Sequence, residues 1–131
     1  LIGDLLRGAM MYVSGSYYES FSLPPMEAMA CGCPVVTTAN VGVLEYAIND
    51  VNVLLCDVGK PEQLANAMLK LVLDIELRNK LIANGFTTVR NYRWAYIIPQ
   101  IAAYYKDVSH WTPATKGELS RRKIQPDIHK P

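Results

Sequence analysis

Histidine is scarce in this chain: its 131 residues include only His110 and His129, both near the carboxyl end. A serine or cysteine nucleophile activated by histidine is therefore not predicted in the rest of the chain, because no histidine is present to act as the base. No cluster of residues has the spacing of a zinc site.

Cysteines and long hydrophobic runs are also scarce. Cys31, Cys33 and Cys56 form neither a Cys-x-x-Cys pair nor a disulfide framework, and an odd number of cysteines is typical of a reducing compartment. We interpret them as small buried apolar residues. No run is long enough to span a membrane and no stretch resembles a signal peptide, so a cytoplasmic protein is expected.

The net charge is close to zero, at +1, and no nucleic-acid partner is expected. Half of the residues are apolar, which suits one small domain over residues 1–108. Prolines and charges dominate residues 109–131, which predicts an extended or disordered basic tail. We interpret its Arg121-Arg122-Lys123 run as solvated, with contact to an anionic membrane surface as the alternative.

Strand and helix patterns alternate along the chain. Short apolar, β-branched stretches predict strands at 10–14 (buried), 34–38 and 52–56. Apolar spacing and prolines predict helices at 2–9, from Pro24 or Pro25 to Gly32, at 44–48, from Pro61, at 75–93 with an interruption near Gly85, and at 94–105 with a kink or restart at Pro99. This alternation predicts a parallel α/β fold, with ligands at the carboxyl ends of the strands.

Two carboxylates, Glu19 and Glu27, bracket the turn that leads into the proline-initiated helix, and Glu27 is expected in its first turn. The N-terminus of a helix carries about half a positive charge and can therefore bind a phosphate. The two carboxylates would repel that phosphate unless they accept hydrogen bonds from hydroxyl groups of the ligand. A nucleotide sugar offers both groups. The alternative is that Glu27 only stabilises the first helical turn and that Glu19 is a solvated turn residue.

The segment Glu19–Val36, including Glu-Ala-Met-Ala-Cys-Gly-Cys-Pro-Val-Val at 27–36, resembles the donor-binding signature of the retaining glycosyltransferases of family 4. The similarity extends more loosely from Leu5 to Lys106. It implies a partial Rossmann-like α/β domain of GT-B type, with parallel strands flanked by helices, corresponding to the C-terminal part of a donor-binding domain.

The resemblance also implies roles for individual residues. Glu19 would be the catalytic residue at the donor sugar, where it stabilises positive charge at the anomeric carbon, and Glu27 would bind the ribose hydroxyls. The donor-binding turn between them would be Ser20, Phe21, Ser22 and Leu23, with the main-chain N–H groups of the last three facing the sugar and the diphosphate. Ser20 and Ser22 stand where the family usually has glycine, which is tolerable if φ stays negative.

The loop that follows the second strand also departs from the family. Val43 stands where the family usually has the second of two glycines, so a close backbone approach is less firmly expected there. Glu45 matches a family glutamate, and we interpret it as a structural residue that caps or pairs locally. Tyr17 and Tyr18 are expected to pack at the edge of the domain, and the alternative is that either of them flanks a ligand.

The implied function is transfer of a hexose-type sugar from a nucleoside-diphosphate sugar to an unidentified acceptor in carbohydrate biosynthesis, without a metal or other cofactor. A missing N-terminal part would supply the acceptor-binding domain and the cations for the diphosphate, so this chain alone is expected to be inactive. The alternatives are an inactive donor-domain fragment that acts as a binding or interaction module, and a GT-B-like epimerase or phosphorylase.

Overall fold

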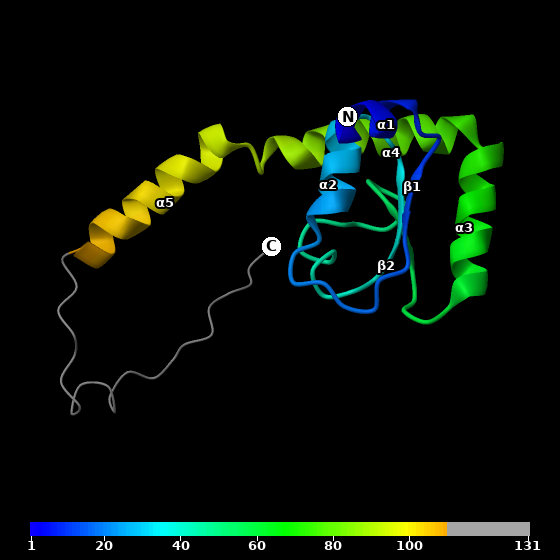
Figure 1. The fold of residues 1–131 in the computed structure, drawn as a ribbon, viewed down its shortest axis with the longest axis horizontal. Helices are drawn as coiled ribbons and strands as arrows, with labels where there is room; N and C mark the ends of the chain where they lie inside the picture. The colour runs from blue at the N-terminus through cyan, green and yellow to red at the C-terminus, as the bar shows by residue number, and fades with distance from the viewer. Residues whose placement is uncertain (110–131) are drawn as a thin grey trace. The chain divides into compact units, whose positions relative to one another are not determined.

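A parallel sheet lies at the centre of the computed structural model, which describes residues 1–109 (Figure 1). Its three strands are β1 (Tyr12–Ser14), β2 (Val35–Thr38) and β3 (Leu54–Cys56), in the order β1-β2-β3. Val13 pairs with Val36, and Val36 pairs with Leu54. The predicted strands and their parallel arrangement are confirmed.

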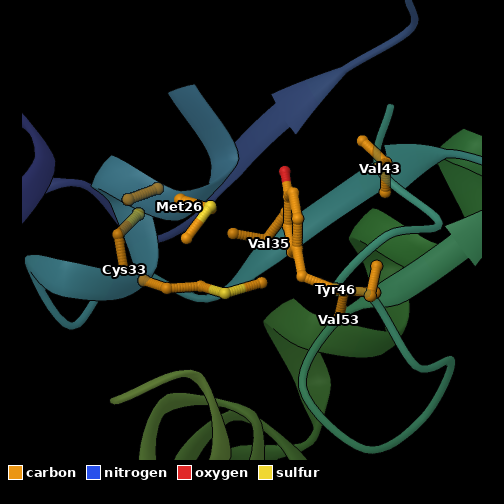
Figure 2. Packing of buried hydrophobic residues seen from close by; sticks show 9 residues of the cluster. Met26, Cys33, Val35, Val43, Tyr46 and Val53 are labelled. Carbon is orange, nitrogen blue, oxygen red and sulfur yellow. The ribbon is translucent and has the colours of Figure 1, made fainter. Parts of the chain in front are cut away.

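The two faces of the sheet bury different side chains, because successive residues of a strand point to opposite faces. Val35 belongs to a cluster with Met26, Met29 and Tyr46, part of which is shown in Figure 2. Val36, on the other face, belongs to a second cluster, which also contains Leu54, Cys56, Leu71 and Leu81. All four residues of β2 are buried, as expected for a central strand.

β1 is half-buried along its length, and Met10 just before it is exposed, so the prediction of a buried strand at 10–14 is wrong in its burial. The reason is its place in the sheet. Within residues 1–109, β1 pairs only with β2 and forms an edge.

Helices flank the sheet: α1 (Ile2–Gly8), α2 (Leu23–Ala30), α3 (Pro61–Leu73) and α4 (Ile75–Arg90). Proline in the first turn begins α3 as predicted, and the Asp74 carboxylate accepts a 2.8 Å hydrogen bond from the main-chain N–H of Leu77 to cap α4. No helix within residues 1–109 has the length and apolarity that crossing a membrane requires.

The predicted interruption of α4 at Gly85 is wrong, because the helix runs continuously through it. A Cβ atom at Gly85 would lie only 3.1 Å from the Cγ atom of Met29 in α2. The glycine therefore allows α2 and α4 to pack closely and does not mark a break in the helix.

The predicted helical piece at 44–48 is also wrong: residues 41–46 form turns. In this segment, side-chain amide groups accept main-chain hydrogen bonds that a helix would otherwise use. The amide oxygen of Asn40 accepts the N–H of Val43 at 3.1 Å, and the amide oxygen of Asn52 accepts the N–H of Ile48 at 2.7 Å. The Asn52 amide nitrogen donates to the Tyr46 carbonyl, which holds the segment in its non-helical path.

The cysteines follow the interpretation made from the sequence. Cys33 and Cys56 are buried, Cys31 is half-buried, and all three are free thiols. Burial raises the pKa of the Cys33 and Cys56 thiols, which keeps them protonated and unreactive near neutrality.

A separate unit begins at Ala95, and it contains most of α5 (Trp94–Ser109). The helix continues through Pro99, so the predicted restart is not observed; proline removes one main-chain hydrogen bond, which does not by itself end a helix. Several of its large apolar side chains are exposed: Tyr96, Ile98, Ile101, Tyr104 and Tyr105. The predicted tail lies outside the described residues, apart from Ser109.

Candidate functional site

Two loops meet at the carboxyl edge of the sheet. The loop after β1 contains Glu19, and the loop after β2 contains Gly42. A Cβ atom at Gly42 would lie 2.6 Å from both the carbonyl oxygen of Glu19 and the main-chain nitrogen of Phe21. The hydroxyl group of Thr38 also donates to the carbonyl of Ser16. Close backbone approach is therefore present at Gly42, although Val43 replaces the other glycine.

Ser22 has a left-handed conformation just before α2, with φ 61° and ψ 70°. The condition under which serine is tolerable in place of glycine, a negative φ, is thus not met at Ser22. Its carbonyl oxygen accepts a 2.6 Å hydrogen bond from the Tyr46 hydroxyl, and the residue is buried. These contacts hold Ser22 in a conformation that favours glycine.

Glu27 lies in the second turn of α2, because the helix begins at Leu23 and Pro24 and Pro25 follow as its second and third residues. The prediction of a first-turn position is wrong, and α2 has no acidic residue in its first turn. Stabilisation of the first turn therefore does not account for Glu27. Its side chain is exposed, and within residues 1–109 it makes neither a hydrogen bond nor an ion pair.

Unpaired main-chain donors lie between the two glutamates. Within the described part of the chain, the N–H groups of Phe21, Ser22 and Leu23 have no hydrogen-bond partner. The half-buried Glu19 likewise has no partner for its carboxylate among these residues. The turn thus places unpaired main-chain N–H groups between two unpaired carboxylates, and their roles toward a ligand stay a prediction.

The charges of Glu19 and Glu27 both affect the pKa of Tyr12. Burial raises the pKa of the Tyr12 phenol, a hydrogen bond with Ser14 lowers it, and the charges of Glu19 and Glu27 raise it further. The structure therefore brings a loop carboxylate and a helix carboxylate within electrostatic range of the same group on β1.

Sequence reasoning did not find an aromatic cluster beneath the turn. The ring of Phe21 lies 5.7 Å from that of Tyr46 and 5.8 Å from that of Tyr92, and the two tyrosine rings are 6.3 Å apart. Burial raises the pKa of Tyr46 well above its ordinary value and outweighs the hydrogen bond with Ser22, which lowers it. No local pattern signals this cluster, because its members come from three distant segments.

A groove of about 690 Å³ also escaped the sequence analysis. Its walls are α2 and the carboxyl-terminal end of α4 with the residues that follow, and Glu27 is part of its lining. The lining residues are Leu23, Met26, Glu27, Ala30, Phe86, Val89, Arg90, Tyr92, Arg93 and Trp94.

The other residues that the sequence singles out, Tyr17, Tyr18 and Glu45, contribute less to the candidate site. Tyr17 and Tyr18 are both exposed, and the Tyr17 ring lies beside Gly59, where a Cβ atom would be 3.6 Å from its hydroxyl oxygen. Glu45 is exposed and makes no hydrogen bond or ion pair within residues 1–109, so the predicted local capping or pairing is not observed. In the same part of the chain, no group of three or more histidine, cysteine, aspartate or glutamate residues is placed to hold a metal ion.

Comparison with known proteins gives the family. The family described as Glycosyl transferases group 1 matches residues 2–88. D-inositol 3-phosphate glycosyltransferase of Thermobifida fusca is 33% identical over 105 residues, which cover 79% of this chain and 24% of that protein.

Two solved structures show the same fold. Sucrose-phosphate synthase of Thermosynechococcus elongatus matches with a TM-score of 0.75 and 32% identity, over 79% of this chain and 26% of its own. HepE of Anabaena in complex with UDP matches with a TM-score of 0.76 and 25% identity, over 79% of this chain and 29% of its own. The chain therefore belongs to the group 1 glycosyltransferases and has their GT-B type of α/β fold, as predicted.

Proposed function

We propose that this chain forms part of the donor site of a retaining glycosyltransferase of family 4, which transfers a sugar from a nucleoside diphosphate to an acceptor. The observation that carries the proposal is the turn from Glu19 to Glu27, with unpaired carboxylates at its ends and unpaired main-chain N–H groups between them. Neither the Glu19 nor the Glu27 carboxylate makes a hydrogen bond or an ion pair with another residue among residues 1–109.

Each part of the turn has a chemical task in this proposal. The N–H groups of Phe21, Ser22 and Leu23 bind the diphosphate, which becomes a more negative leaving group as the glycosidic bond breaks. Glu19 stabilises positive charge at the anomeric carbon, and Glu27 accepts hydrogen bonds from the ribose diol. Ser20 completes the turn. The reaction rests on positioning and electrostatic stabilisation and uses no metal.

UDP sugars are the proposed donors. HepE of Anabaena is seen in complexes with UDP and with UDP-glucose. The fold of HepE matches 79% of the present chain. The acceptor stays open, because the similar proteins are named for different products and acceptors, inositol 3-phosphate and sucrose phosphate among them.

The chain spans only 24% of the length of its relative from Thermobifida fusca. We therefore place acceptor binding and transfer in the intact protein and expect this chain alone to bind donor without turnover. A remnant that serves as a binding module is the alternative. The intact protein tests this alternative. If NMR of the product shows sugar transfer with the anomeric configuration kept, the hypothesis that the chain is only a binding module is excluded.

Calorimetric titration of UDP and UDP-glucose tests the role of Glu19. Glu19→Gln is expected to weaken binding of UDP-glucose about tenfold and to leave UDP unchanged, because only the sugar faces Glu19. Glu62→Gln, in the first turn of α3, is the matched control and should change neither affinity. Equal affinity of Glu19→Gln and wild type for UDP-glucose would contradict the proposal.

A further inference from the structure

Ser22 is the residue of the donor-binding turn whose backbone conformation needs support. Its φ of 61° lies in the left-handed region, which glycine adopts freely and other residues adopt at a steric cost. The Ser22 side chain does not offset that cost by capping α2, because it accepts no hydrogen bond from the first turn of the helix. The support for this conformation therefore comes from another part of the chain.

Tyr46 supplies the support from the turns after β2. Its hydroxyl group donates a 2.6 Å hydrogen bond to the Ser22 carbonyl. Burial raises the pKa of Tyr46, which keeps this hydroxyl group protonated and able to donate at neutral pH. The ring belongs to the buried cluster that contains Val35 and Val53 (Figure 2), and the Tyr46 carbonyl accepts a 2.8 Å hydrogen bond from the Asn52 amide. The donor is therefore held in place by its own neighbours.

The hydrogen bond acts on the peptide unit that joins Ser22 to Leu23. This unit is trans, so its carbonyl oxygen and its N–H group point in opposite directions. Because the Ser22 carbonyl points to the buried Tyr46 hydroxyl group, the Leu23 N–H points away from it, and Leu23 is 60% exposed. That N–H has no partner within residues 1–109. The bond at the carbonyl also polarises the peptide unit, which makes the N–H a stronger donor.

We infer that Tyr46 is a positioning residue of the donor site: its bond to the Ser22 carbonyl directs the Leu23 N–H at the donor phosphates. The inference rests on the proposed function, which assigns the diphosphate to the N–H groups of this turn. Tyr46 acts through Ser22 and not by contact with the donor. Loss of its hydroxyl group allows Ser22 to leave the left-handed conformation, and the N–H groups of Ser22 and Leu23 rotate with it.

Calorimetric titration of UDP in a double-mutant cycle tests this role. Tyr46→Phe is expected to raise the Kd for UDP about fivefold. Ser22→Gly should keep the Kd of wild type. With glycine at position 22, Tyr46→Phe should raise the Kd by less than about twofold, since glycine holds the left-handed conformation without support.

A control variant separates positioning from stability. Val36→Ala opens a cavity in the cluster on the other face of the sheet, away from the donor-binding turn. It should lower the urea midpoint and leave the Kd for UDP unchanged, because the turn keeps its conformation. A purely structural role of Tyr46 predicts the same pair of results for Tyr46→Phe.

NMR observes the Leu23 N–H directly. The sequence Ser-Leu occurs only at positions 22 and 23, so isotope labelling of serine carbonyls and leucine amides selects the signal of this one peptide unit. UDP should shift the signal to saturation in wild type, and uridine, which lacks the phosphates, should shift it much less. In Tyr46→Phe the signal should move before any ligand is added, because the peptide unit loses its fixed orientation.

The possible failures are distinct. UDP binding of equal strength by wild type and Tyr46→Phe would overturn the positioning role and leave the proposed function standing. An equal rise of the Kd in Tyr46→Phe with serine and with glycine at position 22 would show that Tyr46 does not act through Ser22, and would also overturn the inference. Absence of UDP binding by a wild-type chain that circular dichroism shows to be folded would overturn both.

Discussion

The hydroxyl group of Tyr46 donates a 2.6 Å hydrogen bond to the main-chain carbonyl of Ser22. Tyr46 lies in the turns after β2, and Ser22 is the left-handed residue that precedes α2. The contact therefore joins the two loops at the carboxyl edge of the sheet. It fixes the path of the main chain where the unpaired N–H groups of the donor-binding turn begin.

Removal of the Tyr46 hydroxyl is expected to destabilise the fold. In Tyr46→Phe the ring packing is kept, but the Ser22 carbonyl loses its donor, which costs about 1 kcal/mol. Urea unfolding measures the loss as a lower midpoint. Tyr92→Phe is the control, since the Tyr92 hydroxyl makes no hydrogen bond within residues 1–109, and it should lose much less. Equal losses in the two variants would contradict this role.

Stability is expected to fall in alkaline solution, in part because of Tyr46. Its pKa is raised in the folded state, mainly by burial, from an unfolded value of 10.0. Below pH 10 the phenol is protonated in both states and the contribution is fully present; above pH 10 only the unfolded state ionises readily, so stability declines as pH rises. Urea midpoints from pH 8 upward should show a shallower decline in Tyr46→Phe. Parallel declines would show that Tyr46 is not responsible.

Addition of one methyl group at Gly42 is expected to displace the donor-binding turn. The new Cβ would lie 2.6 Å from main-chain atoms of Glu19 and Phe21, which cannot move aside as a flexible side chain can. Gly42→Ala should cost about 1–3 kcal/mol and weaken UDP binding. Gly8→Ala is the matched control, because a Cβ there meets no heavy atom within 4 Å. Wild-type UDP affinity in Gly42→Ala would show that the loop contact does not position the turn.

Glycine at position 22 is expected to stabilise the chain. Serine at φ 61° carries the steric cost of the left-handed region, about 1–2 kcal/mol, whereas glycine avoids it at an entropic cost of roughly 0.5–1 kcal/mol. Ser22→Gly should therefore raise the urea midpoint modestly. Ser22→Ala, which keeps the Cβ atom, should give no gain. A rise in both variants would assign the effect to the hydroxyl group instead of the backbone.

Local patterns in the sequence were enough to predict much of the fold. β-branched residues mark β2, and Pro61 marks the start of α3. The motif from Glu19 to Val36 led to a glycosyltransferase of GT-B type, which agrees with the group 1 family, because it combines residue types at fixed spacing within one segment. These features depend on neighbours in the chain, so a single sequence contains the information for them.

Features that depend on distant residues were missed. The left-handed Ser22 is supported by Tyr46, 24 residues away, and the Asn52 side chain, which holds the turns at 41–46, also bonds Thr88 on α4. The groove needs the end of α4 beside the start of α2, which no local pattern specifies.

The position of Glu27 was missed for a local reason. Glu27 was predicted in the first turn and lies in the second, because the helix begins at Leu23, before both prolines.

Calorimetric titration of UDP into the chain and into Glu27→Gln tests the central claim most directly, with Glu76→Gln in the first turn of α4 as the matched control. The account predicts saturable binding by wild type and by Glu76→Gln, and a Kd raised about tenfold or more in Glu27→Gln, because the neutral amide accepts hydroxyl groups less strongly than a carboxylate does. UDP binding of equal strength in all three proteins would contradict the claim that Glu27 binds the ribose of a nucleotide-sugar donor.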